Sequence, residues 1–95
     1  MKTKNKKEKS TMPVICRFYG IVIRMYFQQA EHNPPHVHAL YGDDVAAIEL
    51  QNGEVLEGHL PPKALSMVRE WVSLHKSELL EMWTTQEFKL VSPLQ

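Results

Sequence analysis

Hydrophobic and polar residues alternate along the first half of this chain. Between residues 21 and 27 every second residue is apolar and large, while Arg24 and Tyr26 fall between them. Residues 36–41 alternate in the same way, with His36 and His38 on one side and Val37 on the other. A period of two residues is typical of strands that bury one face. With the neighbouring β-branched and aromatic runs, the pattern predicts strands over residues 14–19, 21–27, 36–41, 45–50 and 55–60.

The period changes after Pro61 and Pro62. From there to about Trp83, one stripe of side chains recurs at steps of three and four: Ala64, Val68, Trp71, Val72, His75, Leu79 and Met82. Proline is well tolerated at the first helical position, because its missing N–H is not needed there. The stripe therefore predicts one long amphipathic helix packed on the sheet, with His75 as a core histidine.

Turn residues complete the predicted topology. The pair Asn52-Gly53 favours a tight type I′ hairpin turn between two strands, because both residues tolerate positive φ. Residues 88–91 predict a short closing strand before Pro93. The expected fold class is α+β, a small and mostly antiparallel sheet of about five to six strands with one long amphipathic helix packed on it.

Length and composition set the domain organisation. The chain has 95 residues, 43% of them hydrophobic and 23% charged, with a formal net charge of +0, as in an ordinary globular domain. The segment 1–11 holds five lysines and one glutamate, so we expect a basic flexible tail at 1–11 and a single α+β domain at 12–95. Cys16 is the only cysteine, which excludes an intrachain disulfide.

Several partners and locations are disfavoured by the same sequence. No apolar run approaches the roughly 20 residues needed to span a bilayer, and Arg17 and Arg24 interrupt the most hydrophobic segment. We therefore expect no membrane partner and a cytoplasmic location. A DNA-binding regulator is disfavoured because the pattern contains no helix-turn-helix pair and the body without its tail is acidic. The sequence gives no indication of oligomeric state.

The candidate chemistry lies in the run from His32 to His38, which surrounds Pro34 and Pro35. Strand alternation aims His36 and His38 in one direction, roughly 6 to 7 Å apart. Two imidazoles can serve phosphoester chemistry as general base and general acid, because their ordinary pKa of about 6.5 suits both roles near neutrality.

We assign the remaining candidates around these two histidines. Catalytic candidates are His36 and His38, together with Arg24 to stabilise charge on phosphorus. Binding candidates are His32, Tyr26 and His59, the last only if its strand neighbours the strand of His36.

Two other interpretations of the cluster stay open. A histidine beside a proline-rich turn often bonds a loop carbonyl and fixes a corner, which would make the cluster structural. Two imidazoles of one strand could also bind a metal, with His32, Glu31, Asp43 or Asp44 as a further ligand. A His-x-His pair without cysteine or a helical His-Glu-x-x-His is a weak metal signature, so no metal and no cofactor is assigned. Whether the protein is an enzyme stays open.

These motifs resemble a known family. Gly20-Ile21, Met25-Tyr26, the run from His32 to Ala39, Tyr41-Gly42 and the run from Gly58 to Pro61 carry the resemblance, followed by Glu70-Trp71, Glu78-Leu79 and Trp83. They are similar to a family of small prokaryotic proteins catalogued as a domain of unknown function, and the similarity extends from Met12 to about Leu94. The Pro-Pro-His-x-His segment is its most specific element.

The resemblance implies a function that composition and spacing do not. Members of that family often occur beside a second small domain, and the pair has been named a toxin–antitoxin system with this type as the toxin. The implied role is thus the toxin of a type II pair, with a small cognate antitoxin protein as partner and RNA as a possible target. The alternatives are a non-catalytic protein-interaction module with structural histidines and a metal-dependent hydrolase.

Overall fold

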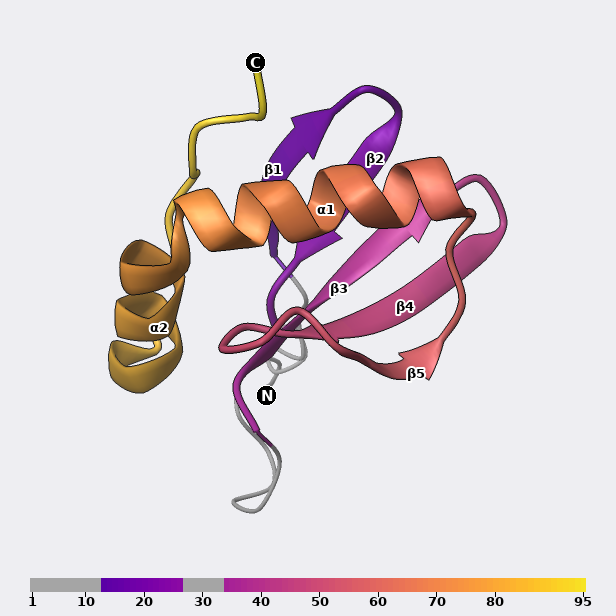
Figure 1. The fold of residues 1–95 in the computed structure, drawn as a ribbon. Helices are drawn as coiled ribbons and strands as arrows, with labels where there is room; N and C mark the ends of the chain where they lie inside the picture. Colours follow the sequence, from indigo (N-terminus) through magenta and orange to yellow (C-terminus); the bar gives the residue numbers. More distant parts are fainter. Residues whose placement is uncertain (1–12, 27–33) are drawn as a thin grey trace, which may run out of the picture.

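The computed structural model describes residues 13–26 and 34–95, and within them the chain is an α+β domain (Figure 1). Its sheet has five antiparallel strands in the order β1-β2-β3-β4-β5. The strands are β1 (Val14–Phe18), β2 (Ile21–Arg24), β3 (His36–Tyr41), β4 (Asp44–Glu49) and β5 (Val55–Gly58). Two helices follow, α1 (Pro62–Leu74) and α2 (Lys76–Thr85). The expected α+β class with a small antiparallel sheet is confirmed, with five strands.

The type I′ turn of the sheet lies where the sequence did not predict it. Tyr19 (φ 50°) and Gly20 (φ 80°) join β1 to β2, and positive φ at both central residues is the requirement of a type I′ turn. The type I′ prediction for Asn52-Gly53 is wrong, because only Gly53 (φ 74°) has positive φ there. That loop is longer, and the Gly53 N–H donates to the carbonyl of Glu49 at 2.9 Å.

The two faces of the sheet differ, as the alternation predicts. Residues opposite one another in an antiparallel pair share a face. Ile23, Ala39 and Ala46 lie in one such row and are buried in the core. Helix α1 crosses this side of the sheet (Figure 1), which we call the helix face. We call the opposite side the open face; it carries the row Arg24, His38, Ala47 and Glu57.

The predicted single long helix is broken at His75 (φ −113°, ψ 21°), between α1 and α2. The 13 residues of α1 span about 20 Å, roughly the width of five strands at about 4.8 Å spacing. A straight continuation would carry the apolar residues of the second half past the sheet. The break turns α2 toward the end of the sheet (Figure 1), where it buries Leu79, Met82 and Trp83. Neither helix is long and apolar enough to cross a membrane.

The position of His75 corrects a further expectation. It lies at the break, with its side chain 20% exposed and its Nδ1 3.5 Å from a carboxylate oxygen of Glu78, rather than inside the core. One face of its ring still contacts Trp71, with ring centroids 5.5 Å apart. The helical period passes through position 75 unchanged, so the pattern alone gives no sign of the break.

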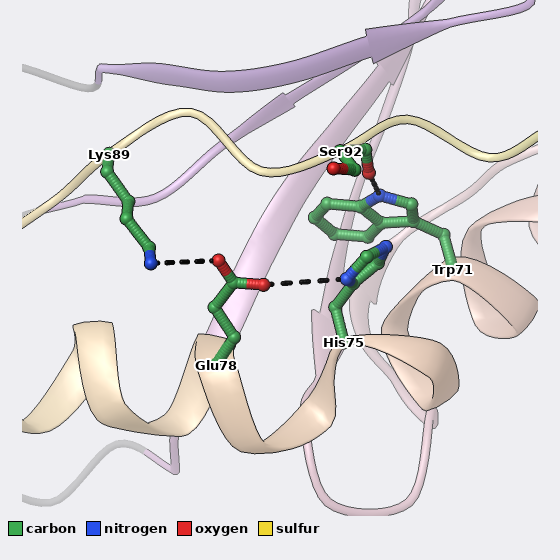
Figure 2. A network of polar contacts seen from close by, with 5 residues as sticks. All are labelled: Trp71, His75, Glu78, Lys89 and Ser92. Carbon is green, nitrogen blue, oxygen red and sulfur yellow. Dashed lines mark hydrogen bonds and ion pairs between the residues drawn. The ribbon is translucent and has the colours of Figure 1, made fainter.

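The segment after α2 is not the closing strand predicted at residues 88–91. Its backbone bonds to the sheet edge where the Val91 N–H donates to the carbonyl of Ile15 at 2.8 Å. Two side-chain interactions also attach this segment to the helices (Figure 2). Trp71 Nε1–H donates to the Ser92 carbonyl at 2.8 Å, and Lys89 Nζ lies 3.0 Å from Oε2 of Glu78. A ladder cannot continue through Pro93, which has no N–H.

A β-bulge interrupts the pairing of β4 with β5. Ala47 lies opposite Glu57 and Ile48 lies opposite Val55, so Leu56 is an extra residue on β5. Gly58, two residues after Leu56, has φ 84°. A Cβ atom built on Gly58 would lie 2.1 Å from the carbonyl oxygen of Val45. The close approach of β5 to β4 at this point therefore requires glycine.

We predict that Gly58→Ala destabilises the protein far more than Gly42→Ala. Both residues have positive φ, a strain of about 1–3 kcal/mol for alanine, but a Cβ at Gly42 would meet no atom within 4 Å. Only Gly58→Ala adds a backbone clash, so its free energy of unfolding should fall by at least about 2 kcal/mol more. Chemical denaturation of both variants measures this. Equal losses would contradict the close approach.

Candidate functional site

Two histidines of β3 meet on the open face. Val37 between them points into the core, and this alternation turns His36 and His38 outward together. Their ring centroids are 5.1 Å apart at an interplanar angle of 68°. The sequence-based expectation that they share one face is therefore met.

His36 is fixed by two contacts at the start of β3. Its Nδ1 donates to the carbonyl oxygen of Pro34 at 2.8 Å, and its ring lies against Trp83 of α2 with centroids 5.1 Å apart. These are the contacts of a histidine that holds a corner of the fold. Because the carbonyl needs a donor, Nδ1 carries the hydrogen, and Nε2 of the neutral ring keeps a lone pair.

His38 contacts two rings and is partly buried. Tyr26 stacks on it with centroids 4.1 Å apart and an interplanar angle of 18°, and His36 contacts it in a T-shaped arrangement with centroids 5.1 Å apart. Burial lowers the pKa of His38 below the ordinary 6.5, and charge on His36 lowers it further, while the carboxylate of Glu57 opposes both. The neutral ring is therefore favoured at neutral pH, which suits it to accept a proton.

One nitrogen of His38 is unsatisfied. Its Nδ1 is buried and has no hydrogen-bond partner among residues 13–26 and 34–95. Desolvating such a group without a partner costs on the order of 1–3 kcal/mol. Burial of this atom leaves Nε2 as the nitrogen through which His38 can exchange a proton.

The other predicted site residues divide into three groups. Arg24 lies directly opposite His38 on β2, and Tyr26 stacks on the same ring, so both join the cluster. His59 does not, because it is exposed beyond the end of β5, and β4 separates β5 from β3. His32 lies outside the described residues.

Glu57 belongs to the same surface and was missed by sequence reasoning. The row Arg24, His38, Ala47 and Glu57 crosses four strands of the open face. A pocket of about 260 Å³ lies beside it, lined by His38, Val45, Ala46, Ala47, Glu57 and Gly58. No sequence signal places Glu57 there, because its orientation depends on the bulge at Leu56.

The described residues do not converge as a metal site would require. Within 13–26 and 34–95, no group of three or more His, Cys, Asp or Glu side chains could hold a metal ion. Asp43 and Asp44 lie at the turn between β3 and β4, whereas His36 begins β3 at the other end. Glu31 and His32, the other suggested ligands, lie outside the described residues.

Comparison with known proteins gives a family and nothing beyond it. Residues 20–84 match the family described as "Domain of unknown function (DUF4160)", and the chain therefore belongs to that family. The matched range includes both histidines of β3, Arg24, Tyr26 and Glu57. A search of curated proteins and a search of solved structures gave no match.

The lowered pKa of His38 predicts a pH dependence of stability. The His38 imidazole binds a proton more tightly in the unfolded chain than in the folded one. The free energy of unfolding therefore has its full value above the ordinary pKa of 6.5, and it decreases as the pH falls from there through the lower pKa of the folded state. We predict that the free energy of unfolding falls from about pH 7 to about pH 5 and falls less in His38→Asn.

The matched control for this pH dependence is His59→Asn, which removes an exposed histidine. It should keep the pH dependence of the unmodified protein, measured by denaturation at each pH. An equal acid loss of stability in His38→Asn and the unmodified protein would show that burial of His38 is not its source.

Proposed function

We propose that this protein is the toxin of a type II toxin–antitoxin pair and acts on phosphoester bonds, with RNA as the favoured target. The observation that carries the chemical part is the pair of imidazoles on the open face, one fixed by Pro34 and one kept neutral by burial. Arg24 opposite His38 supplies a cation on the same surface.

In the proposed reaction the two histidines have different roles. His38, neutral at neutral pH, takes the proton of the attacking hydroxyl as that oxygen bonds to phosphorus. His36 in its protonated form gives the Nε2 proton to the leaving oxygen as the bond from phosphorus to that oxygen breaks. The Nδ1–H bond from His36 to Pro34 persists through both protonation states, so the ring keeps its orientation. Arg24 stabilises the negative charge that develops on the phosphorus oxygens.

The proposed partner is a small cognate antitoxin protein. This part rests on the resemblance of the Pro-Pro-His-x-His segment and its neighbours to a family named as toxins, together with membership of the matched family. Co-expression with the protein encoded beside it tests this part separately from the chemistry.

A second candidate function is a non-catalytic interaction module. The contacts of His36 with the Pro34 carbonyl and with Trp83 favour it, because they show what a purely structural histidine would do here. In that case the open face or a sheet edge would engage a partner protein. The two candidates differ in what substitution of the histidines does at constant stability.

We predict that expression without a partner arrests bacterial growth and that the double variant His36→Ala with His38→Ala relieves the arrest. General acid–base groups each contribute about 10²–10⁴-fold to a rate, so the catalytic rate of the double variant should be too low to arrest growth. His59→Ala, a control outside the cluster, should arrest growth as strongly as the unmodified chain. Growth curves and in-cell protein levels are the measurements.

Thermal unfolding of the purified variants separates the two candidate functions. The catalytic role expects a folded double variant that no longer arrests growth. A folded double variant that remains fully toxic would remove both histidines from the mechanism and leave the interaction module.

A further inference from the structure

We infer that Glu57 is a third functional group of the His36–His38 site, a carboxylate that faces His38 across a slot in the open face and contacts the hydroxyl of the substrate bound there. The inference rests on the proposed function for the identity of the substrate. The placement of Glu57 beside His38 rests on the strand register and on the residues that line the pocket between them.

The bulge on β5 is what brings Glu57 to this face. Val55 lies opposite Ile48 and packs against the core, so it points to the helix face. In a regular strand, residues two apart share a face, and Glu57 would then point toward the core with Val55. The extra residue Leu56 reverses this, and Glu57 lies opposite Ala47 on the open face instead. Bulges beside active sites commonly redirect a side chain in this way.

A second irregularity follows directly and supports the first. Gly58 adopts φ 84°, and a Cβ there would come within 2.1 Å of the Val45 carbonyl oxygen. Leu56 thus has no partner residue on β4, and position 58 requires glycine. These two irregularities flank Glu57 and accompany the placement of its side chain on the open face.

Small residues keep the space between Glu57 and His38 open. Ala47 lies between them in the row across the sheet, and its methyl group forms the floor of the slot. With Ala46, Val45 and Gly58 it lines the pocket of about 260 Å³ that both functional side chains border. A carboxylate and a neutral imidazole both accept hydrogen bonds, so the slot suits a group that donates them. A ribose hydroxyl is such a donor; it has one hydrogen, which goes to His38 in the proposed transfer, so Glu57 then acts on the transfer through its charge.

Electrostatics gives Glu57 a role in the proton transfer. The groups that face His38 are Arg24 from β2, Tyr26 beyond it, His36 on β3 and Glu57 from β5. The negative charge of Glu57 raises the pKa of His38, against the larger effect of burial. When His38 takes a proton from the substrate hydroxyl, the nearby carboxylate stabilises the imidazolium that forms.

We test the pairing by NMR titration of the His38 imidazole in the full chain. Glu57→Gln should lower the pKa of His38, because it removes the negative charge and keeps the shape of the side chain. The control is Glu54→Gln in the exposed loop before β5, which should leave the His38 titration unchanged. An unchanged His38 titration in Glu57→Gln would overturn the inference.

Growth arrest tests the contact with substrate. Glu57→Gln and Ala47→Val, which narrows the slot, should both reduce the arrest at unchanged melting temperature, whereas Glu54→Gln should not. If the histidine variants relieve the arrest while Glu57→Gln and Ala47→Val still cause it, the inference is overturned. The bulge would then serve only to keep the edge strand β5 from pairing with another chain. If the unmodified chain does not arrest growth, the proposed function fails, while the titration still decides whether Glu57 and His38 are paired.

Discussion

The alternation of side chains along β3 is the constraint on which both the core and the candidate site depend. β3 is the central strand, hydrogen-bonded to β2 on one side and β4 on the other. Val37 and Ala39 are fully buried on its helix face, while His36 and His38 point to the open face. A slip of one residue would exchange the two sets, placing imidazoles in the core and apolar groups outside. The packing that fixes the core therefore also fixes the direction of the histidines.

His36 connects the two roles that histidines in this motif can have. Its Nδ1 bonds the Pro34 carbonyl and its ring packs against Trp83, which joins the start of β3 to α2. Both contacts leave Nε2 uncommitted, so a structural role for one nitrogen is compatible with a chemical role for the other. His38 differs, because its Nδ1 is buried without a hydrogen-bond partner in the described part of the chain, and its ring stacks on Tyr26. The cost of that burial favours a neutral ring, which is the form a general base requires.

Periodicity predicted the parts of this molecule that regular alternation determines. The faces of β2 and β3 follow from their apolar positions, and with them the shared orientation of His36, His38, Arg24 and Tyr26. The break at His75 was not predictable, because the apolar stripe continues across it and only the width of the sheet makes a straight helix unsuitable. The I′ turn at Tyr19-Gly20 was missed because tyrosine is not a residue that favours positive φ.

The limits of prediction at the site have the same origin. The separation of His59 from the cluster depends on strand order, which places β4 between β5 and β3. Glu57 could not be assigned because one extra residue on β5 decides which face it occupies. The position of Glu57 is therefore set by the β-bulge, which the alternation of residues in the sequence does not reveal.

The proposed cleavage of RNA by the histidine pair through acid–base chemistry is tested most directly by product analysis. Purified protein should cleave RNA in excess chelator and leave 2′,3′-cyclic phosphate and 5′-hydroxyl ends, because the 2′-hydroxyl attacks as His38 takes its proton and His36 protonates the leaving 5′ oxygen. The double variant His36→Ala with His38→Ala should give no such ends. Identical cyclic-phosphate ends from the folded double variant, or no cleavage by the unmodified protein, would contradict the account.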